Sequence, residues 1–328
     1  MTHDPGEPPH GLPGHRHPHA PGDPSGRPRV GIAGAGAVGS ALAIALAGAG
    51  WPVRAVASRD PGRSARLVAQ VPGLRAVPLA ELPEEADLIL ATVPDDALPA
   101  VASGLRLYGG QAIVHTSGAL PAAVLAPACG AGALTGSFHP LVAFAETTRA
   151  VSALRGATVA IEGDAPLLPL LAELARDLGA SPVLLPPGGK PAYHAAAVLA
   201  AGGMIALLDA IAEVARGAGM DEAGALAIYL PLVRQGLANA EAGGIAAALT
   251  GPFLRGDAGT VRDHLATLER LAPGALDLYR AAARREVAIA RERGALDASA
   301  ALRLGGLLDE PGRPGPAAGE GTEGGRRG

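Results

Sequence analysis

RVGIAGAGAVG, residues 29–39, decides the fold of this chain of 328 residues. A β-rich run leads into a G-x-G-x-x-G motif, and a helical pattern over residues 40–49 follows at once. In that setting the glycines permit a tight turn, let backbone N–H groups approach a pyrophosphate, and allow close packing of helix on strand. Coincidence is the alternative, because the chain holds 47 glycines. We predict dinucleotide contacts at Gly34, Gly36, Ala37, Val38 and Gly39.

Short β-rich runs alternate with helical patterns as far as residue 187, at residues 29–33, 53–57, 87–92, 112–115, 157–161 and 182–185. This alternation is typical of a doubly wound, mainly parallel sheet, so we predict an α/β Rossmann dinucleotide-binding domain over residues 29–187. Alanine- and leucine-rich helical patterns follow, and we predict an all-helical substrate and dimerisation domain over residues 188–308. Residues 195–208 lack any polar side chain, which predicts a central, buried helix.

The two ends of the chain are rich in glycine, proline and charge, and residues 1–28 and 309–328 are predicted to be disordered tails. His15, His17 and His19 offer a loose metal site, but such tracts are more often solvated low-complexity sequence, so no metal is predicted.

Composition narrows the possible partners. The formal net charge is −4 and no basic cluster lies between residues 30 and 308, which argues against nucleic acid. Cys129 is the only cysteine, so a disulfide within the chain is excluded and a reducing cytoplasm is favoured. The longest apolar stretch, residues 195–208, is too short to span a bilayer, and the N-terminal sequence does not resemble a secretion signal. We predict a soluble cytoplasmic protein.

The second β-rich run ends in Ser58 and Arg59, where NAD-binding proteins place an acidic residue. A hydroxyl and a guanidinium suit a ribose 2′-phosphate, and Arg63 in the next turn adds a second cation. Asp60 lies one residue away from the acidic position, so NAD(H) stays an alternative. NADP(H) is the predicted cofactor.

Polar residues follow the later strands, at the sheet edge where doubly wound folds bind ligands. Val93 and Pro94 are predicted to face the cofactor, whereas Asp95 and Asp96 are expected to cap the next helix. His115 and Ser117 follow one strand, and a similar group stands at residues 136–140. Ser117, Ser137 and His139 are predicted to form a polar wall for the substrate.

Lys190 is the only lysine beside 26 arginines. An ammonium can lose its proton where a guanidinium cannot, so this position suits a proton donor. Pro191 fits the first helical position, which places Lys190 near an N-cap, and both burial and the helix dipole would lower its pKa. His194 lies one turn further on. A solvated surface lysine is the alternative.

The helical domain adds candidates for substrate contact. Asn239 is the only asparagine and lies late in a predicted helix, where asparagine is unfavourable without a hydrogen-bonding role. Asp257 is expected to cap the helix that carries His264. Arg255 is predicted to clamp a substrate carboxylate, with Asp257 and Thr260 beside it.

GIAGAGAVGSALA, HTSGAL, GSFHP, KPAYHAAAVLA and LTGPFLRGDAGTVRDHL together resemble a bacterial family that pairs a Rossmann-like domain with a helical domain of unknown function. The resemblance covers residues 29–290. It implies kinship with ketopantoate reductase, β-hydroxyacid dehydrogenases and pyrroline-carboxylate reductase, and a helical domain like that of 6-phosphogluconate dehydrogenase. In the first two groups a lysine and an asparagine one turn later act as catalytic acid and orienting partner. Those positions match Lys190 and His194.

The resemblance also leaves questions open. It does not say whether Lys190 or His194 delivers the proton, and Gly202 and Gly203 stand where family members tend to carry an asparagine. It implies an NADPH-dependent reductase of a small 2-oxo carboxylate, with 2-oxopantoate as the first candidate, and a homodimer through the helical domain. The alternatives are an imine reductase of the pyrroline-carboxylate type and a non-catalytic NADP-binding sensor.

Overall fold

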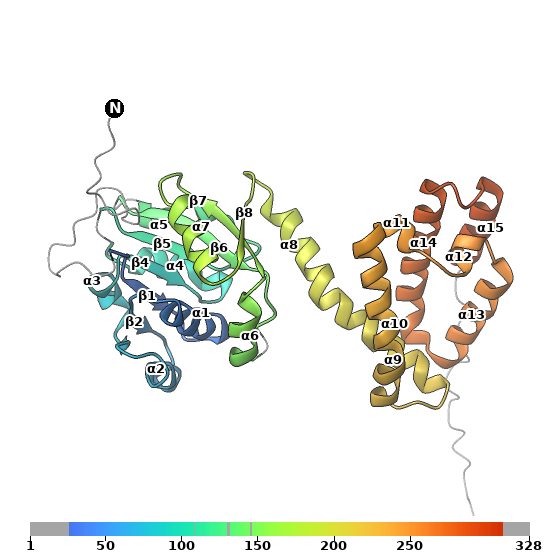
Figure 1. The fold of residues 1–328 in the computed structure, drawn as a ribbon, viewed down its shortest axis with the longest axis horizontal. Coiled ribbons are helices and arrows are strands. Elements are labelled where there is room, and N and C mark those ends of the chain that lie inside the picture. Colours follow the sequence, from blue (N-terminus) through green and yellow to red (C-terminus); the bar gives the residue numbers. More distant parts are fainter. Residues whose placement is uncertain (1–25, 108, 130–131, 145, 311–328) are drawn as a thin grey trace, which may run out of the picture. The chain divides into compact units, whose positions relative to one another are not determined.

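The computed structural model describes residues 26–107, 109–129, 132–144 and 146–310. The predicted tails therefore fall largely outside the described residues. The chain forms two compact units, Met1–Val198 and Leu199–Gly328 (Figure 1). Their division falls inside the long helical segment that we expected to open the second domain.

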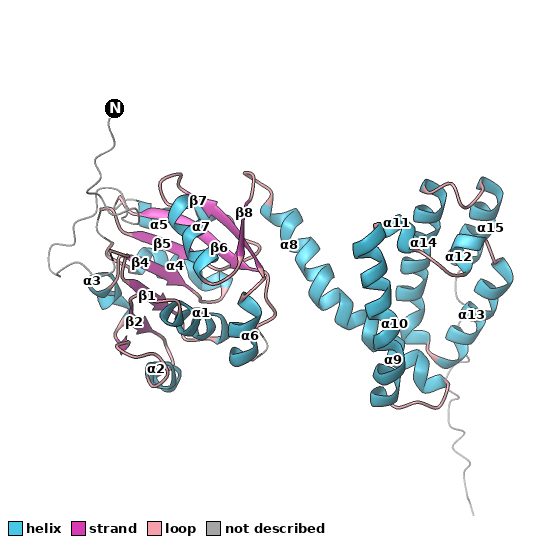
Figure 2. Ribbon diagram, viewed as in Figure 1, coloured by secondary structure: helices cyan, strands magenta, loops and turns pink. Residues whose placement is uncertain are grey.

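The first unit is an eight-stranded sheet with helices on both faces (Figures 1 and 2). The strands follow the order β3-β2-β1-β4-β5-β6-β7-β8, and every neighbouring pair is parallel except β6 and β7. The chain leaves the centre of the sheet in opposite directions from β1 and β4, which creates the crevice where such folds bind dinucleotides. The strands are β1 (Val30–Ala33), β2 (Val53–Ala57), β3 (Arg75–Ala76), β4 (Leu88–Ala91), β5 (Ala112–His115), β6 (Leu134–Pro140), β7 (Thr158–Gly163) and β8 (Ser181–Leu184).

The helices of this unit connect the strands. They are α1 (Ala37–Gly48), α2 (Pro61–Val68), α3 (Leu82–Glu85), α4 (Leu98–Gly104), α5 (Ala126–Cys129), α6 (Thr147–Leu154), α7 (Leu168–Asp177) and α8 (Lys190–Val198), with 3-10 turns η1 (Leu79–Glu81), η2 (Asp95–Ala97) and η3 (Ala122–Leu125). The prediction of a mainly parallel α/β unit followed by helices is confirmed. The sequence analysis missed β3 and β6; β6 contains glycine, histidine and proline, which obscure a strand pattern.

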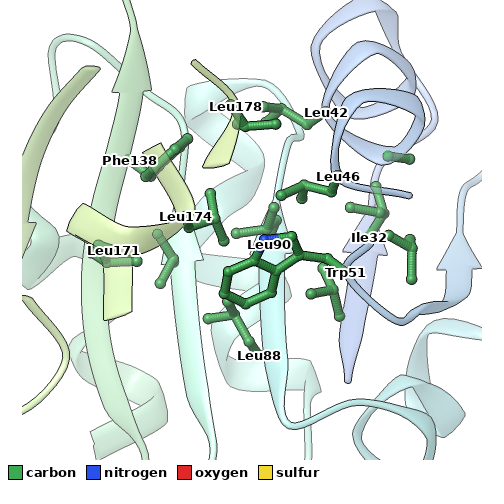
Figure 3. Packing of buried hydrophobic residues seen from close by; sticks show 14 of the residues in the cluster. Ile32, Leu42, Leu46, Trp51, Leu88, Leu90, Phe138, Leu171, Leu174 and Leu178 are labelled. Atoms are coloured by element: carbon green, nitrogen blue, oxygen red, sulfur yellow. The ribbon is translucent and has the colours of Figure 1, made fainter. Parts of the chain in front are cut away.

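Each face of the sheet has its own core because strand side chains alternate. Ile32, Leu88 and Leu90 pack under α1 and α7, against Leu46 and Leu174 (Figure 3). Ile89 and Ile113 belong to the opposite core, with residues of α4. The central strands are thus buried on both sides, as parallel strands usually are.

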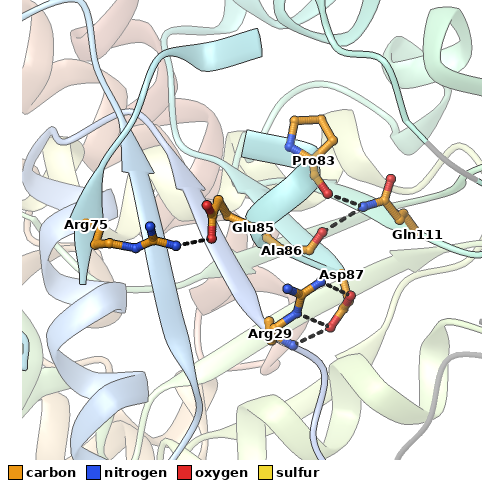
Figure 4. A network of polar contacts seen from close by, with 7 residues as sticks. All are labelled: Arg29, Arg75, Pro83, Glu85, Ala86, Asp87 and Gln111. Carbon is orange, nitrogen blue, oxygen red and sulfur yellow. Dashed lines mark hydrogen bonds and ion pairs between the residues drawn. The ribbon is translucent and has the colours of Figure 1, made fainter. Parts of the chain in front are cut away.

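Polar contacts join the strand ends opposite the predicted site (Figure 4). Arg29 donates to both carboxylate oxygens of Asp87 just before β4, at 2.9 and 3.2 Å. Gln111 donates to two backbone carbonyl oxygens before β4, both at 2.7 Å, and Arg75 pairs with Glu85. These contacts fix the amino ends of the strands and leave the carboxyl edge to the loops that carry the candidate site.

The second unit is helical. It comprises a π-helical turn η4 (Leu199–Gly203), α9 (Met204–Gly217), α10 (Glu222–Gly243), α11 (Ile245–Ala248), α12 (Pro252–Arg255), α13 (Ala258–Leu271), a 3-10 turn η5 (Pro273–Ala275), α14 (Leu276–Glu292) and α15 (Ala298–Asp309). Its main core joins α12 to α15 around Phe253, Leu268, Val287 and Leu304.

The expected burial of residues 195–208 is wrong for this chain taken alone. Leu199 is 73% exposed and Ile205 is 66% exposed, and Ile228, Leu232 and Leu237 of α10 are exposed as well. The apolar segment also extends past Asp209: among the described helices, Lys190–Gly217 alone is long and apolar enough to cross a membrane. Length and composition do not separate a membrane span from an apolar helix of a soluble protein.

Candidate active site

The glycine-rich loop between β1 and α1 has a different requirement at each glycine. Gly34 adopts φ +114°, and a Cβ there would lie 2.7 Å from the backbone oxygen of Thr92. A Cβ on Gly39 would lie 2.0 Å from the oxygen of Gly34, so the start of α1 can pack against the loop only without a side chain. Around Gly36 nothing lies within 4 Å of the missing Cβ. That space suits close approach of a pyrophosphate to backbone N–H groups.

The first turn of α1 has the features of an anion-binding site. Gly36 is its N-cap, no side chain caps the helix, and the first turn has no acidic residue. Helix α1 begins at Ala37, three residues before the predicted start, so Ala37 and Val38 contribute N–H groups at the positive end of the helix. The Thr92 hydroxyl, just after β4, donates to the backbone oxygen of Gly34 at 2.7 Å and thereby holds the glycine-rich loop in place. The arrangement therefore fits a dinucleotide phosphate.

After β2, the carboxylate of Asp60, which is the alternative partner for a ribose, already has hydrogen-bond partners within the protein. Asp60 caps α2 by accepting hydrogen bonds from the N–H groups of Gly62 and Arg63, and it forms an ion pair with the Arg63 side chain at 3.2 Å. The Arg63 N–H bond, the largest cause, helps to hold the pKa of Asp60 below its ordinary value. Ser58 and Arg59 stand at the strand end, and Arg59 is exposed. This region presents cations and a hydroxyl, as a 2′-phosphate requires.

The loop after β4 departs from expectation. Val93 and Pro94 lie there as predicted, but neither Asp95 nor Asp96 caps α4, whose N-cap is Ala97 without a side-chain hydrogen bond. Instead, Asp95 accepts a hydrogen bond from the Ser117 hydroxyl at 2.8 Å. The intervening 3-10 turn η2 moves both carboxylates away from the helix start. Asp95 thereby joins the loops after β4 and β5.

Lys190 is the first residue of α8, one position from the predicted N-cap, and is 2% exposed. Its Nζ donates to the backbone oxygen of Ser117 at 2.6 Å and to the hydroxyl of Ser137. Burial lowers the pKa of Lys190 to about 8, against the opposing effect of Glu162 and Asp95. The expected direction of that pKa shift is confirmed. This ammonium holds the carboxyl ends of β5 and β6 to the start of α8.

His115 is fully buried and braces the loop after β5. Its Nδ1 accepts from the N–H of Ser117 at 3.1 Å, which leaves Nε2 to donate to the oxygen of Pro121 at 3.2 Å. Burial first, and Lys190 second, lower the pKa of His115 to about 4. Both nitrogens of this neutral ring are therefore occupied, and His115 fixes the backbone that Lys190 binds.

Three further rings meet beside this cluster. His139 Nδ1 lies 3.0 Å from the Tyr193 hydroxyl, and the rings of His139 and His194 are 5.9 Å apart edge to face. A Cβ on Gly118 would lie 2.4 Å from His194 Nδ1 and 2.7 Å from His139 Nε2. Gly118 is thus needed for both imidazoles to approach the loop. The sequence analysis did not single out Gly118 or Tyr193, although both stand inside motifs that it quoted.

The candidates of the helical unit lie on α10 to α13. Asp257 caps α13 through the N–H of Thr260 at 3.1 Å, as expected, and also accepts from the Thr260 hydroxyl at 2.7 Å. Asn239 and Arg255 are exposed. His264 contacts the hydroxyl of Tyr279 at 2.8 Å. Asp257 and Thr260 are thus brought together by a cap, while Asn239 stands on a separate helix.

A pocket of about 740 Å³ also lies in the first unit, between η3 and the ends of β7 and β8. Glu162 forms part of its wall and pairs in register with Ser137, the residue that holds Lys190. Its lining is mostly apolar. Across the described ranges there is no group of three or more histidine, cysteine or acidic side chains able to hold a metal ion.

Comparisons with known proteins match two segments of the chain, and the second segment begins at β7, within the first unit. Residues 17–140 match the model of a Rossmann-like domain, and residues 157–286 match a domain of unknown function, DUF2520. An L-aspartate dehydrogenase of Bordetella bronchiseptica is 43% identical over 95 residues, which are 28% of this chain and 35% of the relative. The match thus spans about a third of that curated relative.

Solved structures resemble the whole fold. Protein TM1727 from Thermotoga maritima has a TM-score of 0.64 and 26% identity, covering 80% of this chain and 99% of the other. A reductive aminase from Aspergillus terreus, in complex with NADPH and ethyl-5-oxohexanoate, has a TM-score of 0.55 and 18% identity over 86% and 92% of the two chains. A 1-pyrroline-5-carboxylate reductase from Streptococcus pyogenes has a TM-score of 0.56 and 19% identity over 81% and 98%. The last two similarities establish the fold.

Proposed function

The chain joins a Rossmann-like domain to a DUF2520 domain, and on that premise we propose that it is an NADPH-dependent reductase of a small 2-oxo carboxylate, with 2-oxopantoate as the best single candidate. One observation carries the proposal. A buried lysine with a lowered pKa lies beside two histidines at the carboxyl edge of a sheet whose glycine loop fits a dinucleotide. Proton donation and hydride transfer require those two features together.

NADPH is the proposed cofactor because Asp60 is engaged as a helix cap while Ser58 and Arg59 end β2. Gly36 and the first turn of α1 would bind the pyrophosphate, and Arg59 with Arg63 would bind the 2′-phosphate. Bound NADPH would supply a hydride to the carbonyl carbon of the substrate. The residues near Lys190 would then stabilise the alkoxide and supply a proton to its oxygen.

The decisive experiment is a titration of the full chain with NADPH, followed by fluorescence, with and without 2-oxopantoate. We expect tighter binding of NADPH than of NADH, and turnover of 2-oxopantoate to the 2-hydroxy acid. Arg59→Ala should reduce the preference for NADPH, whereas Arg66→Ala, at an exposed arginine of the following helix α2, should not. Tight NADPH binding without turnover across a panel of carbonyl compounds would favour the NADP-binding sensor instead.

Imine reduction is the second candidate, because a reductive aminase and a pyrroline-carboxylate reductase share this fold. A dedicated lysine is not expected for that reaction. Lys190→Arg therefore separates the two, since a guanidinium keeps the positive charge but does not give up a proton in a protein. For ketone reduction we expect a loss of roughly 10²-fold or more in kcat, in the range typical of general acid catalysis. Comparison of 2-oxopantoate with a cyclic imine completes the test.

We also propose a homodimer through the helical unit, in a reducing cytoplasm that suits the single cysteine. Large apolar side chains are exposed on both α9 and α10, including Ile205 and Leu232, and exposed apolar surface of this kind marks interaction sites. Light scattering should report twice the mass of the chain. Leu232→Glu should dissociate it, whereas Leu302→Glu, at a 77% exposed leucine of α15, should not.

Substrate contacts remain proposals. Arg255 would clamp the substrate carboxylate, with Asp257 and Thr260 fixing the loop that carries it. Ser117, Ser137 and His139 would shape the polar wall, and Asn239 would add an amide. Arg255→Ala should raise KM for the keto acid with little change in NADPH affinity.

A further inference from the structure

We propose that His194 delivers the proton, from Nε2, and that His139 and Tyr193 are positioning residues that hold its ring through Nδ1. This inference rests on the proposed reductase function and decides between the two donors that function leaves open. Lys190 then has a different role, because it fixes the loops and supplies positive charge beneath them.

The contacts of Lys190 limit its access to a substrate. Its Nζ donates to Ser117 O and to the Ser137 hydroxyl, and the residue is 2% exposed. Two of its three N–H groups are thereby engaged, and the neighbouring Ser137 is itself fully buried. His194 is more open, because it is only partly buried on the same helix.

The two ring nitrogens of His194 differ in their surroundings. Nδ1 is buried and has no hydrogen-bond partner, one of two such side-chain atoms among the residues described. Leaving a buried polar atom unpaired is unfavourable, so this nitrogen needs a partner in the working state. Nε2 does not share that condition. It is the nitrogen available to a ligand.

His139 supplies the missing partner. The missing Cβ of Gly118 would be 2.4 Å from His194 Nδ1 and 2.7 Å from His139 Nε2, so these two nitrogens lie within about 5 Å of each other. No hydrogen bond joins them in the structure, and a rotation of the rings would bring the two nitrogens within hydrogen-bond distance. On its other side, His139 Nδ1 meets the Tyr193 hydroxyl at 3.0 Å. Three groups thus form a series from Tyr193 through His139 to His194.

His139 is the uncharged member of that series. Burial, followed by Lys190 and His194, lowers the pKa of His139 to about 4, so His139 is neutral at neutral pH. The charged or titratable groups around the pair are Lys190 on α8, Asp95 after β4 and His115 on β5. A neutral His139 with its proton on Nδ1 donates to the Tyr193 oxygen, which leaves its Nε2 to accept from an N–H at His194 Nδ1.

The step is balanced. When bound, NADPH would supply the hydride for the new C–H bond and would be oxidised to NADP⁺, while the carbonyl π electrons would become an alkoxide lone pair. The His194 Nε2–H bond breaks, and its proton forms the O–H bond of the product. His194 is left neutral with its proton on Nδ1, still donated to His139, and regains a proton from water.

The first test does not need a cofactor. In the cofactor-free full chain, ¹⁵N NMR of labelled histidine rings follows each imidazole through a pH titration. We expect His139→Asn to shift the titration of His194, and Tyr193→Phe to change the tautomer signals of His139. The matched controls His264→Asn and Tyr279→Phe, from the other histidine–tyrosine pair, should leave the His194 and His139 signals unchanged. An identical His194 titration in His139→Asn would overturn the proposal.

The second test is kinetic. His194→Gln should lower kcat by roughly 10²–10⁴-fold and abolish the fall of kcat at high pH that reports a donor losing its proton. Lys190→Met should also lower kcat but keep that fall, and Tyr193→Phe should shift it. The proposal fails if His194→Gln keeps kcat within twofold while Lys190→Met removes the high-pH fall. Should NADPH not bind at all, the reductase function fails, and the NMR result still decides whether His139 partners His194.

Discussion

Two histidine–tyrosine pairs, one in each unit, have nearly the same internal geometry. His139 Nδ1 lies 3.0 Å from the Tyr193 hydroxyl, and His264 Nδ1 lies 2.8 Å from that of Tyr279. Their ring centroids are 5.6 and 6.0 Å apart, edge to face in both. The contacts within each pair therefore do not show which of the two pairs is functional.

The surroundings separate them. His139 lies beside Lys190 and a second histidine, and burial lowers its pKa to about 4. His264 is exposed on α13, and its tyrosine rests against Phe253 of the helical core. The comparison indicates that neighbouring charge and burial, more than the residue pair itself, make a chemical site.

The largest effect should come from adding one methyl group next to the half-buried pair of the first unit. In Gly118→Ala the new Cβ would stand 2.4 Å from His194 Nδ1 and 2.7 Å from His139 Nε2, so both rings must move. A displacement of about 1 Å at a catalytic group costs on the order of 10²-fold in rate. We expect that loss in kcat with NADPH affinity retained, since Gly118 is remote from the glycine loop in sequence and belongs to another strand end.

The matched control is Gly259→Ala, in the first turn of the helix that carries His264. There the nearest atom to the new Cβ is 3.6 Å away, an ordinary contact. Steady-state kinetics should show wild-type kcat in this variant. Wild-type kcat in Gly118→Ala would mean that the ring positions next to that glycine are irrelevant to catalysis.

The next effect concerns the free energy of unfolding at acidic pH. A histidine whose pKa falls from 6.5 unfolded to about 4 folded stabilises the fold fully above pH 6.5 and loses that contribution as pH falls toward 4. Between those values the unfolded state binds more protons, so the free energy of unfolding decreases. With a discount for partial exposure, His139 accounts for about 2 kcal/mol. Urea denaturation at pH 7 and pH 4 should show a smaller loss in His139→Asn.

His264→Asn provides the comparison for that measurement, because it removes a histidine with the same tyrosine contact from an exposed helix. Its loss of stability between the two pH values should equal that of the unsubstituted chain. Equal losses in His139→Asn and His264→Asn would contradict the assignment of the lowered pKa to burial in the first unit.

Sequence was sufficient for the fold and indicated several of the residues that the structure brings together. The G-x-G-x-x-G motif placed β1 and α1, and the pattern of β-rich runs indicated the parallel sheet, because local residue preferences agree with burial there. It failed at β6, whose glycine at position 136 is required by packing: a Cβ there would lie 2.9 Å from Leu167. That requirement arises between segments far apart in sequence and leaves no periodic pattern.

Similar reasons explain the misses at the site. The role of Asp95 depends on the 3-10 turn η2, which aims it at Ser117 rather than at the helix start. Gly118 is important because the imidazole rings of His139 and His194, which belong to other elements, approach it closely. The apolar pattern of residues 195–208 predicts burial, but sequence does not say whether the surface that covers such a helix belongs to the same chain.

A smaller effect distinguishes the contribution of charge to the pKa of His139 from the contribution of burial. Lys190 lowers the pKa of His139, although burial is the larger cause. Lys190→Met removes the charge and retains much of the apolar volume. The pKa of His139 should therefore rise above about 4 but stay below the ordinary 6.5, as measured by ¹⁵N NMR, while the His264 signals stay fixed. A return to the ordinary value would mean that the charge, and not burial, controls the ring.

The smallest effect is expected at the exposed pair. Tyr279→Phe removes the hydroxyl that meets His264 but keeps the ring against Phe253, so only a partly solvated hydrogen bond is lost. Such bonds contribute about 0.5–1.5 kcal/mol, and water replaces this one in part, so the change should fall at the low end. Thermal unfolding should register it, and kcat should not change. A fall in kcat comparable to that of Tyr193→Phe would give the second pair a role in the reaction, and the contrast between the two pairs would then no longer rest on their surroundings.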